Sequence, residues 1–459
     1  MKRFWVVLLL LGLIAAFSTS AMAVDVKFSG EYSVTGMYLD RTTSHKGYTI
    51  PGEVPTIVGE GPSTAFYYQR LRLKTEFVVA PGLSLVARAD IMERAWGAAR
   101  SSGSQPDMFG ILPMSGGTRA ENENIAFDWL YISYLSPIGH FLVGYVDYGV
   151  WGTVFGDSSW IAPRIMYTVA KGGLTLRTAY VKGYEESQGT FSNPVPRTYA
   201  PGATDMDYDI YYPIVATYAF KQGIVGLLTQ YQRIATTRPA PYGNYMTNVA
   251  GISPYAKLKF GPVSLQAEMA YAFGKYRDSE IDAPDIDAEN WSGWIDAVAD
   301  FGMFYAGGSL AYVSGDDPAT SDKLEGGLFS GGYNWSPCLI MWNYDRYVWA
   351  GSINGYDGTS NSSPFSNGYF AQLRGGVRPV DKLDVMASVS WAKADKIGNK
   401  IDRDYGYEVD LTATYKITNN LSYMLGAGYW FVGDWYKGGS TANEVDDNFM
   451  VINKLTLTF

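Results

Sequence analysis

The chain has 459 residues, a formal net charge of -9 and a mean hydropathy of -0.08. Helical membrane proteins contain several long apolar runs, so this near-neutral hydropathy excludes helical spanning. A single cysteine allows no disulfide within the chain, which excludes a small disulfide-stapled scaffold. The acidic balance argues against a nucleic-acid partner.

The first 23 residues have the order of a secretory signal peptide. Lys2 and Arg3 are basic, an apolar run extends from Phe4 to Phe17, and Ala21-Met22-Ala23 is a small-x-small cleavage site. A retained membrane anchor is the alternative, but the apolar run is short for a span of about 20 residues. We therefore predict a signal peptide over 1–23 and one domain over 24–459.

Apolar and polar residues alternate along much of the remaining chain with the period of a β-strand. In the clearest example, Tyr405 to Ile417, the odd positions are mostly apolar and the even positions mostly polar. Its 13 residues exceed the usual soluble strand of about 5 to 6 residues, and this length fits a tilted membrane strand. Tyr407 and Tyr415 would then lie on the lipid side near the two interfaces.

Eighteen segments share this alternation, and bacterial barrels favour even strand numbers. We predict an all-β fold, a transmembrane antiparallel β-barrel of about 18 strands, with 16 as the alternative. In chain order the segments are 26–39, 66–79, 83–94, 124–135, 141–147, 161–169, 174–184, 207–220, 224–234, 249–260, 263–276, 290–301, 303–313, 368–380, 383–394, 405–417, 421–432 and 448–459.

The links between these segments alternate in kind. Tight turns rich in Gly, Pro, Asn and Asp begin at Ala80, Ser136, Lys171, Lys221, Gly261, Asp381 and Thr418. The longer links are 40–65, 95–123, 148–160, 185–206, 235–247, 277–289, 314–367, 395–404 and 433–447. Short turns at one end and long loops at the other predict periplasmic turns and extracellular loops.

The last predicted strand runs to the terminal residue, Phe459. It must close the barrel against the first strand, because an open edge in hydrocarbon would leave backbone groups unsatisfied. Together with the signal peptide and the alternating strands, this ending resembles Gram-negative outer-membrane porins. The resemblance implies that the barrel-assembly machinery reads Phe459. It also implies an outer-membrane location among lipid and lipopolysaccharide, a homotrimer, and passive diffusion of small hydrophilic solutes and ions.

A second resemblance concerns the segment GGYNWSPCLIMWNYDRYVWAG, Gly331 to Gly351. It is similar to a loop of porins from sulfate- and metal-reducing bacteria. This resemblance adds an alternative function, a barrel that sheathes a separate cytochrome. The chain itself has no Cys-x-x-Cys-His haem attachment motif, only Cys338, which we interpret as a packed small hydrophobe.

If the apolar parity faces lipid, the opposite parity faces the lumen. Charges are costly in a packed core but cheap beside water, so we predict a wet lumen. In general porins a basic ladder faces an acidic, inward-folded third loop, but the third loop here is shorter and lacks the usual acidic motif. Solvation of the inner wall is therefore an equal alternative to a constriction. The predicted pore-lining residues are Arg70, Arg72, Lys74, Arg88, Asp90, Asp128, Asp147 and Asp157.

Two further functions can be weighed from single residues. A hydrolase usually needs a histidine base, and only His45 and His140 exist. They fall at opposite ends of the predicted barrel, about 25 Å apart, so we predict no enzyme. A channel selective for sugars is the alternative form of transport, for which Trp430 and Tyr68 would provide stacking surfaces in the lumen.

The segment RDSEIDAPDIDAEN, Arg277 to Asn290, is strongly acidic. The simple interpretation is a solvated extracellular loop. The sharper hypothesis is weak calcium binding, because hard cations take about 6 to 8 oxygen ligands, with lipopolysaccharide bridged outside the cell. No other cofactor is predicted. The acidic residues concerned are Asp278, Glu280, Asp282, Asp285, Asp287 and Glu289.

Overall fold

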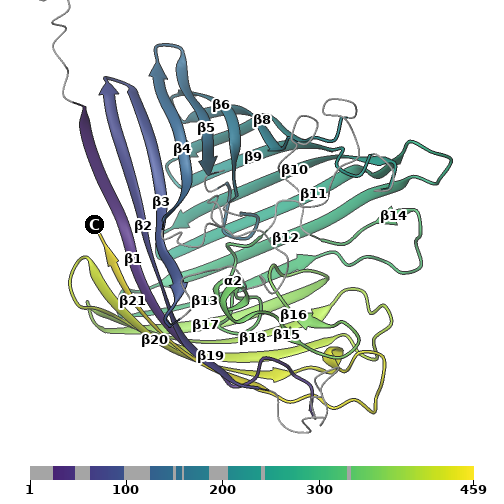
Figure 1. Ribbon diagram of the computed structural model, residues 1–459. Helices are drawn as coiled ribbons and strands as arrows, with labels where there is room; N and C mark the ends of the chain where they lie inside the picture. The colour runs from purple at the N-terminus through teal and green to yellow at the C-terminus, as the bar shows by residue number, and fades with distance from the viewer. Residues whose placement is uncertain are drawn as a thin grey trace, which may run out of the picture.

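The computed structural model describes residues 24–46, 62–97, 125–147, 151–157, 160–185, 205–238, 243–327 and 332–459. In these ranges eighteen long strands form one antiparallel sheet that closes on itself (Figure 1). The predicted 18-stranded barrel is thereby confirmed, and the 16-stranded alternative is wrong. The predicted signal peptide lies outside the described residues and stays a prediction.

The strands of the barrel follow one another around the wall in chain order. They are β1 (Asp25–Leu39), β2 (Thr64–Ala80), β3 (Leu83–Ala95), β4 (Ile125–Ser136), β5 (Gly139–Asp147), β6 (Ile161–Lys171), β7 (Leu174–Tyr184), β8 (Tyr208–Phe220), β9 (Gly223–Ile234), β10 (Tyr245–Phe260), β11 (Val263–Ser279), β12 (Ile286–Asp300), β13 (Phe304–Val313), β17 (Gly368–Val380), β18 (Leu383–Ala394), β19 (Asp404–Lys416), β20 (Leu421–Val432) and β21 (Asn448–Thr458).

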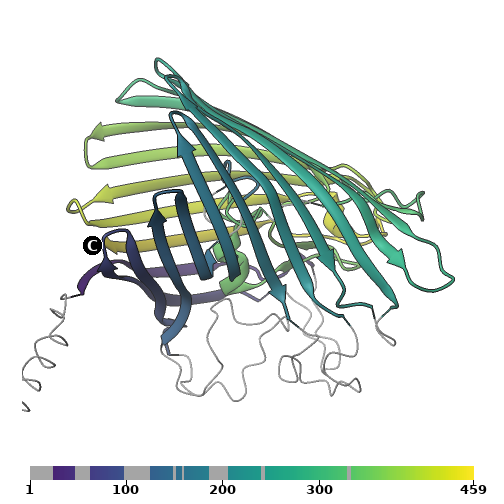
Figure 2. The same cartoon turned by 90° about the horizontal axis from the view of Figure 1, so that it is seen from above.

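The smaller elements belong to the loops. They are β14 (Lys323–Leu324), α2 (Tyr344–Ala350), β15 (Ile353–Asn354), β16 (Ser360–Asn361) and the 3₁₀ helix η1 (Asp434–Lys437). Helix α2 lies inside the barrel outline in both ribbon views (Figure 1, Figure 2). Within the described ranges, no helix has the length and apolar character needed to cross a bilayer.

The barrel closes where β21 pairs with β1, from Glu31 opposite Thr458 to Leu39 opposite Met450. Phe459 continues this seam, because its backbone N–H donates to Gly30 O at 3.0 Å and its carbonyl accepts from Gly30 N–H at 2.9 Å. Its ring packs over Gly30, where an added Cβ would lie 2.8 Å from a ring carbon. The predicted closure by the last strand is confirmed.

Tight turns at one end of the barrel need backbone conformations that glycine adopts easily. Gly172 and Gly261 have φ values of 60° and 59° in the turns after β6 and β10. An added Cβ at either position would meet nothing within 4 Å, so the constraint there is the backbone conformation alone. The opposite ends of the strands carry the long loops, as the sequence pattern predicted.

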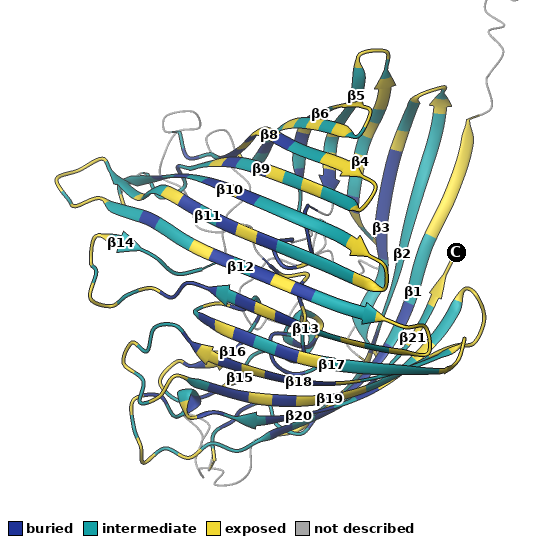
Figure 3. Cartoon of the chain, turned by 180° about the vertical axis from the view of Figure 1, so that it is seen from behind, coloured by how far each residue is buried: buried dark blue, intermediate teal, exposed yellow. Residues whose placement is uncertain are grey.

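The outer face is an apolar belt with aromatic residues at both rims. Buried and exposed residues alternate along the strands (Figure 3). Tyr407 and Tyr415 are both exposed and lie near the two ends of β19, as predicted. Exposed aromatic residues near the loop ends include Tyr67, Tyr211, Tyr231, Phe273, Trp291, Tyr369, Trp391 and Tyr429, and those near the turn ends include Tyr134, Tyr218, Phe220, Phe260, Phe301, Phe304 and Tyr423. This is the surface of a membrane barrel.

One predicted loop is mostly strand. β11 continues to Ser279 and β12 begins at Ile286, so only residues 280–285 of the acidic segment lie between them. The two strands stay paired here through a register shift between Lys275 and Arg277, and β14 adds a short parallel pairing to β12. A bulge lets a pair of strands continue past a mismatch in alternation, which the sequence pattern alone did not show.

Candidate channel lumen

The charged inner wall is built on β2, β3 and β4. Strand parity places Arg72 opposite Asp90 and Lys74 opposite Arg88. Arg72 donates to both oxygens of Asp90, at 2.7 Å from Nε and 2.6 Å from Nη2. Arg88 donates to Asp128 Oδ2 at 2.9 Å from Nη2. The predicted pore-lining residues of these three strands therefore do come together.

This wall is a network of ion pairs, in contrast to the basic ladder of general porins. Arg70 pairs with Glu93 at 3.1 Å, and the Arg88 guanidinium lies 3.8 Å from the ring centroid of Trp129. Lys74 has no ion pair among the described residues. On these three strands the cations are Arg70, Arg72, Lys74, Arg88 and Arg94, and the acids are Glu76, Asp90, Glu93 and Asp128, so five positive charges stand against four negative ones.

The third loop enters the lumen through residues 151–157. Thr153 donates to Glu268 Oε2 on β11 from its backbone N at 2.7 Å and from Oγ1 at 2.5 Å. Phe155 packs against Trp294 of β12 and Trp335 of the long loop. An inward third loop is thus present without the acidic motif of general porins. Sequence reasoning did not single out Glu268.

The two acids predicted for this loop occupy different places. Asp157 is buried, and its Oδ2 accepts from Asn334 Nδ2 at 2.8 Å. It therefore joins the third loop to the long loop. Asp147 is the last residue of β5 and has the parity of the exposed residues Val143 and Tyr145, so its strand position is on the outer face.

The long loop between β13 and β17 fills part of the lumen with an apolar core. Its residues Trp335, Met341, Trp342 and Phe365 are buried. They pack against inward side chains of the wall, which are Met37, Leu39, Phe370, Ala392, Tyr405, Trp430, Met450 and Ile452. The predicted wet lumen is therefore wrong for the wall formed by β1 and β17 to β21, because a dry core lies against it.

Two polar side chains fix this loop. Glu408 of β19 accepts from the backbone N–H of Ile340 and of Met341, each at 2.7 Å. Arg346 of α2 is fully buried and donates to the carbonyls of Ile340, Gly351 and Asn361, at 3.0, 2.5 and 3.1 Å. Burial lowers the pKa of Arg346 to about 10, so it is a cation at neutral pH. The only sequence signal for Glu408 was its even position in a strictly alternating strand.

The aromatic residues predicted to stack on sugars are not exposed in the lumen. Trp430 has no exposed surface and donates from Nε1 to Tyr405 O at 3.1 Å. Tyr68 is stacked on Trp349 of the long loop at 4.2 Å between ring centroids. Both residues are part of the dry core, so neither offers a free ring to a solute.

The two histidines lie apart. His45 stacks on Tyr356 at 4.0 Å in the loop region, and His140 lies beside the turn between β4 and β5. His140 Nε2 is 2.8 Å from Ser133 Oγ, a contact that sequence reasoning missed. No carboxylate completes a triad with this pair among the hydrogen bonds of the described residues.

The acidic segment is largely neutralised by neighbouring cations. Lys275 pairs with Asp287 at 2.6 Å and lies 3.5 Å from Asp285. Glu280 pairs with Arg238, and Glu289 with Lys323, both at 2.7 Å. Asp278 accepts from Asn248 Nδ2 at 2.9 Å. Asp278, Asp287 and Glu289 thus lie on the two strands, whereas Glu280, Asp282 and Asp285 lie between them, and calcium binding there stays a prediction.

The fold and surface define the class of protein. Every edge of the sheet is paired and the outward belt is apolar, which suits hydrocarbon and not water. The chain is a porin-like β-barrel of the bacterial outer membrane.

No family model and no curated protein match this chain. Solved structures that are similar include OccK2 (OpdF) of Pseudomonas aeruginosa, with 12% identity, a TM-score of 0.49, and 94% of this chain and 98% of that chain covered. OpdK of Pseudomonas aeruginosa with vanillate has 14% identity, a TM-score of 0.47 and coverages of 94% and 99%. The anion-selective porin from Comamonas acidovorans has 13% identity, a TM-score of 0.43 and coverages of 95% and 99%. At these identities the similarity is one of fold alone.

Proposed function

We propose that this barrel is a passive diffusion channel for small hydrophilic solutes and ions, narrowed on one side by its own long loop. The observation that carries the proposal is the unequal lumen wall. The loop packs on β1 and β17 to β21, while charged residues face inward on β2 to β4. Water and solutes are therefore expected to pass along the charged side.

The charged wall favours transport over a purely structural barrel. Paired charges on an inner wall remain well solvated only beside water. The side chains of Arg70 and Arg72 keep 32% and 33% of their surface exposed, so part of the network faces solvent. A barrel that sheathes a cytochrome would need the lumen for its partner, and the docked loop already occupies part of it.

Liposome swelling with neutral sugars of increasing size tests this proposal. Liposomes with the purified barrel should swell in small sugars at a rate that falls steeply with solute size. Protein-free liposomes and liposomes with heat-unfolded protein are the controls. Swelling no faster than in the controls for every solute contradicts the channel. The homotrimer and the contact with lipopolysaccharide are further proposals, tested by crosslinking in native membranes.

A further inference from the structure

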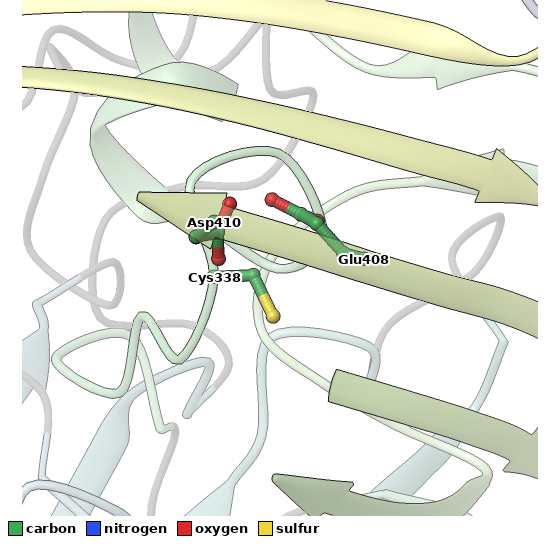
Figure 4. Close-up of side chains that lie close together, drawn as sticks. All are labelled: Cys338, Glu408 and Asp410. Carbon is green, nitrogen blue, oxygen red and sulfur yellow. The ribbon is translucent and has the colours of Figure 1, made fainter. Parts of the chain in front are cut away.

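Three chemically reactive side chains converge where the long loop meets β19. Cys338 comes from the loop, and Glu408 and Asp410 come from the strand (Figure 4). The thiol sulfur and one oxygen of each carboxylate all lie within 4.8 Å of one another. All three residues are buried, with 4%, 0% and 4% of their surface exposed. No other group of three metal-ligating side chains comes this close in the described ranges.

One oxygen of this group has no protein partner. Asp410 Oδ1 is buried without a hydrogen bond, while Oδ2 is 3.4 Å from Ser388 Oγ. A Cβ at Gly428 would lie 2.6 Å from Asp410 Oδ1 and 3.2 Å from Glu408 Oε1. The two oxygens thus share the space that this glycine leaves open. A buried carboxylate oxygen without a donor is costly, so a proton or a cation must lie between the two carboxylates.

The charges of the surrounding groups indicate the charge of that partner. Two ionised carboxylates and a thiolate carry three negative charges, and Arg346, which interacts electrostatically with Glu408, carries one positive charge. A divalent cation makes the sum zero. Without it, the sum is zero only if the thiol keeps its proton and the two carboxyls share one proton, so a metal ion and a shared proton are the two states that the test must separate.

The ligand types decide between classes of divalent ion. Calcium and magnesium take oxygen ligands, whereas thiolate sulfur selects softer ions such as Zn²⁺. Each Glu408 oxygen accepts one backbone N–H and keeps a second lone pair for a metal. We propose that Cys338, Glu408 and Asp410 bind a zinc-like divalent metal ion that fastens the long loop to the barrel wall.

The ion would join two parts of the chain that are far apart in sequence. Glu408 already holds the loop through two backbone N–H groups, and a metal bound to Cys338 would add a second attachment. Water or a backbone carbonyl would complete a four-coordinate site. This attachment is independent of whether the barrel conducts.

Metal analysis and zinc titration of the folded barrel test the proposal. Chelator-stripped protein should take up one zinc ion per chain and melt at a higher temperature with Zn²⁺. Cys338→Ser and Asp410→Asn should each weaken zinc binding by at least about tenfold, since even indirect contacts to a metal contribute about 10 to 100-fold. Glu268→Gln is the matched control, because it alters a buried lumen carboxylate away from Cys338, and it should bind zinc like the wild type.

A spectrum supplies a readout that does not depend on the variants folding. Cobalt in place of zinc should give a thiolate-to-cobalt absorption band in the wild type. Heat-modifiable migration on gels shows which variants are folded, and the band should be missing in folded Cys338→Ser. Absence of the band in the wild type, or equal zinc affinity in the wild type and folded Cys338→Ser, would overturn the proposal. A stripped Asp410→Asn variant that melts above the wild type, with no zinc effect on either, would point to a proton shared by the carboxylates.

Discussion

Two parts of the inner wall follow the same strand parity and use it in opposite ways. On β2 to β4 the inward residues include ion pairs, as in Arg72 with Asp90 and Arg88 with Asp128. On β20 and β21 the inward residues include Trp430 and Met450, which are fully buried. Strand parity therefore determines whether a side chain points into or out of the barrel, but it does not determine what the side chain contacts there. What differs is the long loop, which lies on the second wall and excludes water from it.

The largest effect on both walls is expected when the seam between β1 and β21 is disrupted. Deleting Phe459 removes the backbone pair with Gly30, replacing it with Asp removes the ring that packs over Gly30, and both changes remove the proposed assembly signal. Assembled barrel in the outer membrane should fall severalfold, with more degradation in the periplasm. Quantitative blotting of heat-modifiable barrel in membrane fractions measures this. Phe301→Asp is the control, because Phe301 is an exposed aromatic residue at a turn away from the seam. Unchanged assembly without Phe459 would contradict the role.

The dry wall can be loosened without touching the charged wall. Glu408→Ala leaves the N–H groups of Ile340 and Met341 without acceptors, at about 1 to 3 kcal/mol for each buried group. Burial raises the pKa of Cys338 and shields its thiol, so a maleimide should label this sole cysteine slowly in the wild type and many times faster in the variant. Glu289→Ala, an exposed change, should label like the wild type. Equal labelling of Glu408→Ala and wild type would show that Glu408 does not hold the loop.

The charged wall can be altered in turn. Replacing Arg70, Arg72 and Arg88 with Gln changes the balance on β2 to β4 from five cations and four acids to two cations and four acids. A net negative wall attracts cations, so the reversal potential in a salt gradient should move toward the cation limit. The neutralised partners Asp90→Asn and Asp128→Asn should move it the other way. An unchanged reversal potential in both would leave these residues as solvation of the wall.

The smallest change in stability is expected at the acidic segment, which belongs to neither the charged wall nor the dry wall. Changing Asp282, Asp285 and Asp287 to Asn removes the partners of Lys275. Exposed ion pairs contribute about 0 to 1 kcal/mol, so the melting temperature should change little. If the predicted calcium site exists, calcium should raise the melting temperature of the wild type and not of the variant. Identical melts with calcium and with chelator would leave the segment as solvated charge.

Local sequence patterns predicted most of the fold. Alternation and turn residues predicted all eighteen strands of the barrel, and the strict pattern around Tyr407 predicted the outward face of β19. Such patterns depend on neighbours along the chain, which a single sequence contains. The strand ends were less well predicted where the bulge near Lys275 extends β11 into a polar segment.

The lumen was predicted less well, because its contacts join distant residues. Arg72 was predicted to face the lumen, but its pairing with Asp90 depends on the register of two strands. Trp430 was predicted as a free stacking surface. It is buried because the distant loop between β13 and β17 turns inward and packs in the same core. Glu408 and Asp410 had the inward parity but gave no signal of their partners on the loop.

Single-channel conductance of the wild type and of Glu408→Ala in the same planar bilayer tests the central claim most directly. The claim is that an open lumen is narrowed by the long loop held on the dry wall. We predict an ohmic channel in the wild type and a larger, noisier conductance in Glu408→Ala, with the Glu289→Ala control matching the wild type. A silent wild-type barrel, or equal conductance in the wild type and Glu408→Ala, would contradict the claim.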